Sequence, residues 1–144
     1  MSARGRGRRQ RLAAELEAAL LRWASTPFAW GASDCFTAVA DIIVAARGYD
    51  PASGYRGRYG TARGAARITA PAGGFAGVIE AAAQRDGWIE IEPKDARIGD
   101  VGLARSRSGL RSGVIRHRRM WVGRRDYGFY AVPDDQVGRA WRVK

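Results

Sequence analysis

The sequence predicts an α+β fold, with helices in the first part of the chain and an antiparallel sheet in the second. Up to about residue 87, apolar residues recur at helical spacing between capping and stop signals. After that point the chain divides into short β-rich runs that are separated by turns. The length of 144 residues and the hydrophobic content of 46% fit one domain with its own core.

The first ten residues, 1–10, are expected to form a basic arm, and residues 11–144 to form one domain. Arginines stand at positions 4, 6, 8, 9 and 11, a density typical of a tail without fixed structure. Because such a segment has nothing to bury, we expect it to contact another protein chain rather than its own core. A helix is then predicted over 11–25, and it ends before Pro27. Its apolar face is formed by Leu12, Leu16, Leu20 and Trp23.

The stretch FAWGASDCFTAVADIIVAARG, residues 28–48, predicts a second helix that starts near the single cysteine of the chain, Cys35. Either Ser33 or Asp34 is expected to cap its N-terminus, and Gly48 is expected to end it. The residues expected on its apolar face are Phe36, Val39, Ala40, Ile43 and Val44.

A loop rich in glycine and tyrosine is expected over 48–60, followed by two further helices and then the sheet. The first helix, TARGAARIT, is capped by Thr61, and the second, GFAGVIEAAAQRDG, ends at Gly87. The inner face of the second helix comprises Phe75, Val78, Ile79 and Ala82. Six runs then predict the strands of an antiparallel meander, with turns such as SRSG and GRRD between them: WIEIE, GDVGLAR, GVIRH, RMWVG, YGFYAV and AWRV.

The net charge of +11, from 25 Lys+Arg against 14 Asp+Glu, favours acidic partners. Nucleic acid is the weakest candidate among them, because the charge is scattered and no recognition motif accompanies it. No apolar run reaches the roughly 18 residues of a membrane span and no secretory signal opens the chain, so we expect synthesis in the cytoplasm. Neither a metal nor a cofactor is expected, since one cysteine and one histidine cannot form a structural zinc site and no phosphate-binding loop is present.

The position of Cys35 leaves two interpretations open. A thiol in the first turn of a helix lies at the positive end of the helix dipole, which lowers the thiol pKa and favours the nucleophilic thiolate. On the other hand, a lone cysteine is commonly a small core residue without chemical function. The neighbouring motifs distinguish these interpretations better than the position does.

Four short motifs stand in a fixed order along the chain. They are Trp30-Gly31 with Asp34-Cys35, Arg56-Gly57 with Tyr59, Gly99-Asp100, and Ala140-Trp141-Arg142-Val143. In order and spacing they resemble the NlpC-type branch of the papain-like cysteine peptidase superfamily, in particular a phage tail-associated group. The resemblance extends over residues 11–143. It implies a papain-like domain, in which N-terminal helices pack on a C-terminal antiparallel β-meander or partial barrel.

The resemblance also implies a chemistry and a location. In this superfamily a cysteine thiolate attacks an amide carbonyl, a histidine acts as base and then as acid, and a third polar residue orients the histidine ring. The implied function is that of a phage tail-tip or baseplate peptidase or amidase, a virion hydrolase that cleaves peptidoglycan stem peptides without a cofactor. Its partners would be peptidoglycan and other tail-tip proteins, the latter reached through the arginine-rich arm. The catalytic residues would be Cys35 and His117, and no substrate-binding residue is assigned.

The sequence departs from the family pattern at the histidine. The family histidine directly precedes a small-Gly-Ile/Val step, and here Ser112 fills that slot. The only histidine, His117, comes five residues later and falls on the opposite strand face unless a bulge intervenes. His117 is therefore either the base or a solvated member of the basic run RHRR, and Asp126 is a candidate third residue whose role stays unassigned. The alternative function is a catalytically inactive, papain-like structural component of a tail tip.

Overall fold

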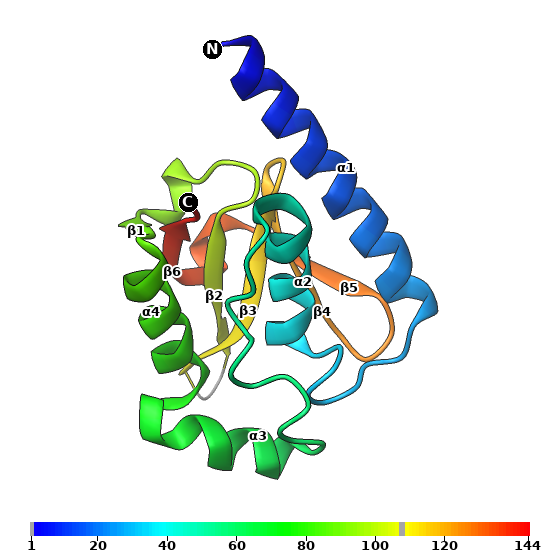
Figure 1. The fold of residues 1–144 in the computed structure, drawn as a ribbon, viewed down its shortest axis with the longest axis vertical. Helices are drawn as coiled ribbons and strands as arrows, with labels where there is room; N and C mark the ends of the chain where they lie inside the picture. The colour runs from blue at the N-terminus through cyan, green and yellow to red at the C-terminus, as the bar shows by residue number, and fades with distance from the viewer. Residues whose placement is uncertain (1, 107–108) are drawn as a thin grey trace.

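Four α-helices and a six-stranded antiparallel sheet make up residues 2–106 and 109–144, the part of the chain that the computed structural model describes (Figure 1). The helices are α1 (Ala3–Ser25), α2 (Cys35–Arg47), α3 (Ala62–Thr69) and α4 (Gly74–Asp86). The strands are β1 (Ile89–Ile91), β2 (Val101–Ser106), β3 (Gly109–His117), β4 (Met120–Arg124), β5 (Phe129–Val132) and β6 (Val137–Arg142). The structure thus confirms an α+β fold with the helices first.

The order of the strands in the sheet is β1-β6-β2-β3-β4-β5. The predicted meander is confirmed for β2 to β5, but β6 does not continue it. Instead β6 returns to the other side of β2 and separates it from β1, so that Val101 pairs with Ile115 on one side and with Trp141 on the other. The predicted SRSG turn includes residues 107–108, which lie outside the described part of the chain.

Helix α1 begins eight residues earlier than the sequence predicts. Ser2 caps it by accepting a hydrogen bond from the Gly5 N–H at 3.1 Å, and the helix runs without interruption from Ala3. The expectation of an arm without fixed structure was therefore wrong: residues 3–10 are the first two turns of a 23-residue helix. Its apolar face is as predicted from Leu12 onward, whereas most of the side chains before Leu12 are exposed.

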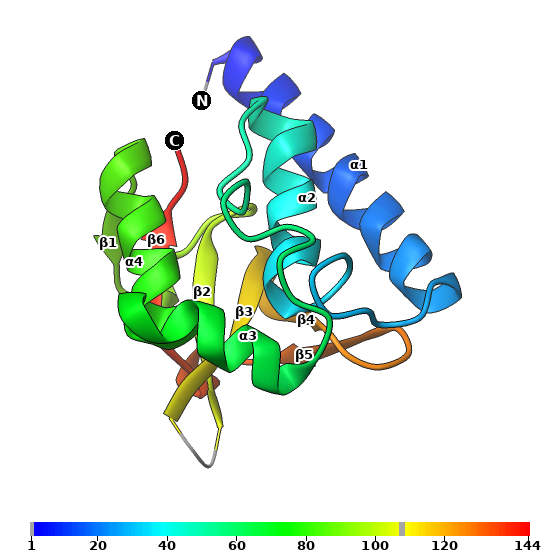
Figure 2. The ribbon, with the colours of Figure 1, turned by 60° about the horizontal axis from the view of Figure 1, so that its bottom comes forward.

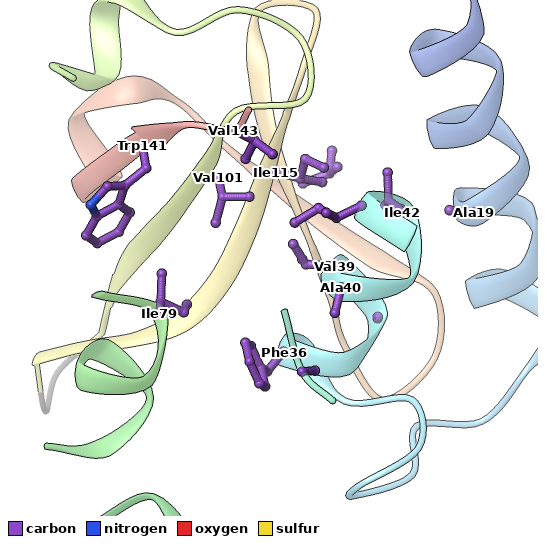
Figure 3. Packing of buried hydrophobic residues seen from close by; sticks show 14 of the residues in the cluster. Ala19, Phe36, Val39, Ala40, Ile42, Ile79, Val101, Ile115, Trp141 and Val143 are labelled. Carbon is purple, nitrogen blue, oxygen red and sulfur yellow. The ribbon is translucent and has the colours of Figure 1, made fainter. Parts of the chain in front are cut away.

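Helix α2 packs on β3 and β4 and forms the centre of the molecule (Figure 3). Its C-terminus is at Gly48 in the left-handed conformation, with a φ of 84°, as the glycine predicted. Most of the predicted apolar face is buried, but Val44 is 40% exposed and Ile42 is buried in its place. The buried face is thus rotated slightly from the predicted one, because α1 covers the side of α2 that carries Ile42 and β3 lies on another side.

Two clusters of buried side chains lie on opposite faces of the sheet. The larger cluster fills the space between the helices and the sheet and includes Ile42 of α2, Ile79 of α4 and Ile115 of β3 (Figure 3). The smaller cluster, on the other face, comprises Ala104, Val114, Trp121, Val137 and Ala140. In the described part of the chain, no helix combines the length and the apolar character that a membrane crossing requires.

Candidate functional site around Cys35

A fully buried carboxylate, Asp34, organises the start of α2. One of its oxygens accepts hydrogen bonds from the Phe36 and Thr37 N–H groups, each at 2.9 Å, and the Thr37 hydroxyl in turn accepts from the Asp34 N–H. The other oxygen accepts from the Gly31 N–H at 2.8 Å and from the Tyr59 hydroxyl at 2.7 Å. Asp34 is thus the helix cap that the sequence predicted, and it also joins the preceding turn to a distant loop.

The loop over 51–58 is held against this turn by the motif that contains Arg56, Gly57 and Tyr59. The Arg56 guanidinium forms ion pairs with Asp41 at 2.8 Å and with Asp50 at 2.7 Å. The Gly57 N–H donates to the Gly31 carbonyl at 2.9 Å, directly beside the Tyr59 contact with Asp34. Two motifs that lie about 25 residues apart therefore form one rigid support behind Cys35. The buried tyrosine was not predicted as a site residue, although the motif that carries it was noticed.

Cys35 opens onto a shallow hollow of about 600 Å³. Phe28 and Trp30 stand at one side of it, ring edge to ring face, with their centroids 4.9 Å apart. The full lining comprises Phe28, Trp30, Cys35, Ser112, Arg124, Arg125, Asp126 and Tyr127. The hollow therefore combines aromatic walls, two guanidinium groups and one carboxylate around the thiol.

The pKa of the Cys35 thiol is raised to about 11, opposite to the predicted direction. Burial is the main cause, and the adjacent Asp34 carboxylate adds to it. The Gly113 N–H partly offsets both by favouring the thiolate. Of the two interpretations that the sequence left open, the raised pKa favours the small core residue, because loss of hydration and a neighbouring negative charge both disfavour the thiolate. At neutral pH the sulfur is a thiol.

Ser112 lines the same hollow as the Cys35 thiol. Its neighbour Gly113 passes so close to α2 that a Cβ there would stand 3.0 Å from the Cys35 carbonyl oxygen. The Ser112 hydroxyl also approaches that of Tyr130 and lowers its pKa, although burial, the larger effect, raises it. No hydrogen bond of regular geometry reaches the Tyr130 hydroxyl from the described residues.

His117 lies at the far end of β3 and lines a different hollow. Four residues separate it from Gly113, which corresponds to about 13 Å along a strand. Ile115 stands between them on the same face and is fully buried. The hollow beside His117 is lined by Leu20, His117, Arg118, Arg119, Met120, Val122, Phe129 and Ala131. The structure thus places Cys35 with Ser112 and places His117 elsewhere.

The hollow beside His117 combines apolar side chains with the charged Arg118 and Arg119. Burial is the main cause that lowers the pKa of His117, the Arg118 charge adds to it, and Glu17 opposes it weakly. Its Nδ1 atom is buried without a hydrogen bond from the described residues. A catalytic histidine is normally oriented by a hydrogen bond to that nitrogen, and this one is not.

The remaining polar candidates have clear positions. Asp126 lines the Cys35 hollow from the turn after β4, whereas His117, the ring that a third polar residue would orient, lines a different hollow. Asp100 instead fixes the turn before β2, accepting from the Arg97 N–H at 2.8 Å and pairing with Arg142 at 3.2 Å. Within the described residues, no three His, Cys, Asp or Glu side chains are grouped as metal ligands.

A buried arginine that sequence reasoning missed connects the hollow to α1. Arg124 is 2% exposed, and its guanidinium donates to the carbonyls of Trp23 and Thr26 at the end of α1. The pKa of Arg124 is lowered by burial. An arginine in a predicted turn gives no signal of such a role, because its partners are backbone carbonyls about 100 residues away in sequence.

Comparison with known proteins gives one match. A family model described as "Domain of unknown function (DUF6950)" matches residues 7–143. No curated protein and no solved structure matches the chain. The matched range contains every residue that lines the Cys35 hollow, and it begins inside α1.

Proposed function

The chain belongs to the family of the Domain of unknown function (DUF6950), and we propose that it is a papain-like phage tail-tip component that does not hydrolyse peptidoglycan. One observation carries the loss of hydrolysis: Ser112, not His117, accompanies the thiol in its hollow. The phage tail location rests on the resemblance of the four sequence motifs. The function favoured first by that resemblance, a peptidoglycan peptidase or amidase, is the alternative that the experiments below test.

The arrangement of α2 supports the papain-like part of the proposal. The cysteine stands in the first turn of a central helix, and the strand that should carry the base passes directly beside it. The Gly99-Asp100 motif precedes the first long strand, as the resemblance implies. The motif with Tyr59 contacts the turn before Cys35. Two of these likenesses therefore lie at the start of α2, where Tyr59 contacts Asp34 and Gly113 approaches Cys35, and the third lies at the start of β2.

The chemistry of the hollow supports the absence of hydrolysis. Attack on an amide requires a thiolate and a group that can take and return a proton. The thiol pKa of about 11 leaves the nucleophile protonated at neutral pH. The Ser112 hydroxyl in the same hollow cannot accept a proton at neutral pH. The His117 ring stands beyond the fully buried Ile115.

Alkylation of Cys35 measures the thiolate directly. A shift from 9.0 to about 11 lowers the thiolate fraction at pH 7.5 roughly 100-fold. We therefore expect iodoacetamide to react with Cys35 far more slowly than with a small free thiol, and the rate to rise with pH up to about 11. A rate plateau near pH 7 would show an activated thiolate and contradict the proposal.

Restoring the base gives the sharper test. We expect Ser112→His to increase the alkylation rate at neutral pH, because an imidazolium beside the sulfur stabilises the thiolate, while Ser112→Ala leaves the rate nearly unchanged. Release of stem peptides from purified peptidoglycan should be absent in the wild type. Release that is abolished separately by Cys35→Ala and His117→Ala would establish the peptidase instead, since nucleophile and base act as one unit.

A further inference from the structure

The N-terminal turns of α1 and the C-terminal end of the domain together form a basic surface. Two neighbouring hollows, of about 500 and 530 Å³, share Arg8, Leu12 and Arg47 and are therefore continuous. The basic residues around them come from four separate segments: Arg4, Arg8, Arg9 and Arg11 of α1, Arg47 at the end of α2, Arg97 before β2, and Arg142 and Lys144 at the end of the chain. Figure 2 shows the start of α1 and the chain end on the same side of the molecule.

No described residue neutralises the charges of the first hollow. Among the described residues, no carboxylate lines this hollow, and none pairs with Arg4, Arg8, Arg11 or Arg47. The second hollow contains the Asp100 side chain, but that carboxylate already pairs with Arg142. An uncompensated group of guanidinium ions held in fixed positions is suited to bind an anion.

These arginines destabilise the start of α1. Arg4 and Arg8 are four residues apart, and Arg8 and Arg11 are three apart, so like charges are neighbours on one face. Arg4 also stands at the positive end of the helix dipole, where the first turn contains no acidic residue. Such local conflict between sequence and structure is typical of binding sites, because the ligand removes it.

The shape of the two hollows and their apolar lining favour one kind of anionic partner over another. The hollows have an apolar floor, to which Leu12, Ala46, Ile98 and Val143 contribute. No aromatic side chain lines either hollow, so there is no platform on which bases can stack. Along α1, Arg4 and Arg8 are about 6 Å apart in rise. An extended peptide with acidic residues at alternate positions spaces them about 7 Å apart and can lay apolar side chains on the floor.

We propose that this basic surface is the docking site for an acidic, extended segment of a partner protein. The carboxylates pair with Arg4, Arg8 and Arg47, and the apolar side chains between them contact Leu12 and Ala46. The inference is independent of whether the Cys35 hollow is catalytic, because the two hollows share no lining residue with that site.

Binding to defined probes tests the proposal on the full-length chain. The probe is a fluorescein-labelled ten-residue peptide with glutamate alternating with leucine and alanine, and its control is the same peptide with glutamine for glutamate. We expect only the glutamate peptide to raise the fluorescence anisotropy on addition of the protein. The double variant Arg8→Gln/Arg47→Gln should weaken binding about tenfold, since both residues line both hollows.

A second double variant removes the same charge elsewhere. In the variant Arg63→Gln/Arg67→Gln, both substituted residues lie on α3, at the opposite end of the molecule from the start of α1 (Figure 1). Its binding should equal that of the wild type, and circular dichroism should show all variants folded. An equal loss of peptide binding in both double variants would show that binding depends on net charge alone, and would contradict a specific site. Failure to bind the glutamate peptide would contradict the proposal. Tighter binding of a labelled 20-base-pair DNA duplex, with the same dependence on Arg8 and Arg47, would also contradict it, because the partner would then be a nucleic acid.

Discussion

The N-termini of α1 and α2 meet the same electrostatic requirement in opposite ways. Each end exposes free N–H groups and the positive end of a helix dipole. At α2, the buried Asp34 carboxylate accepts from two of these N–H groups. At α1, only the Ser2 hydroxyl caps the helix, and arginines follow where acidic residues would stabilise it.

The α2 end therefore supports the fold, whereas the α1 end is suited to bind a partner. The α2 end is complete, because every oxygen of Asp34 is used within the chain and the network fixes the turn before Cys35. The α1 end is incomplete, because its guanidinium groups have no carboxylate partners at the first hollow within the described residues. We therefore expect changes at the α2 end to alter the stability of the fold, and changes at the α1 end to alter binding to a partner.

Removal of the Asp34 carboxylate should have the largest effect. Asp34→Ala leaves the Gly31, Phe36 and Thr37 N–H groups and the Tyr59 hydroxyl without their buried acceptor. We expect the free energy of unfolding in urea to fall by about 4 kcal/mol. The control is Asp135→Ala at an exposed position, which should change it by less than about 0.5 kcal/mol. A small effect of Asp34→Ala would show that the network does not support the fold.

Two glycine substitutions sharpen the comparison, because the same added methyl group has opposite effects at the two helix ends. Gly31 has a φ of 82°, and a Cβ there would collide with the Tyr59 carbonyl oxygen, so Gly31→Ala should destabilise by about 2 kcal/mol or more. At Gly7 a Cβ would meet open space, so Gly7→Ala should stabilise α1 by up to about 1 kcal/mol. Thermal unfolding measures both. A destabilising Gly7→Ala would contradict the helical start of α1.

The smallest expected effect concerns the charge at the start of α1. Arg4→Glu places a negative charge at the positive end of the dipole and removes repulsion from Arg8. We expect the melting temperature to rise by about 1–3 °C, and the rise to shrink at high salt. The same variant should weaken binding of the glutamate peptide, so stability and association change in opposite directions. A fall in both would show that Arg4 has an internal structural role.

The local elements could be predicted from the sequence wherever a cap or a glycine marked them. Asp34, Thr61, Gly48 and Gly87 fixed helix ends that the structure confirms. The start of α1 could not be predicted, since an arginine-rich segment resembles a tail by composition. It forms a helix because it continues one whose buried face, from Leu12 to Trp23, is already anchored.

The candidate site was predictable in its position and not in its chemistry. The sequence predicted Cys35 in the first turn of a helix, which the structure confirms, and paired it with His117, whereas the structure brings Ser112 to the Cys35 hollow. The direction of the thiol pKa was missed, because it depends on burial and on how near the Asp34 charge lies. The separation of His117 from the thiol results from distance along β3, because His117 shares a strand face with Gly113, which contacts Cys35, but lies about 13 Å further along the strand beyond the buried Ile115.

The place of β6 in the sheet has a consequence for the time course of synthesis. In the described residues β1 pairs with β6 alone, and β6 lies between β1 and β2 although it is translated after both. While the ribosome is still making β5, β1 and one edge of β2 therefore have no strand to join. The sheet reaches its full width only once residue 142 has emerged, and until then the nascent chain carries two open strand edges that a chaperone or a neighbouring nascent chain can occupy.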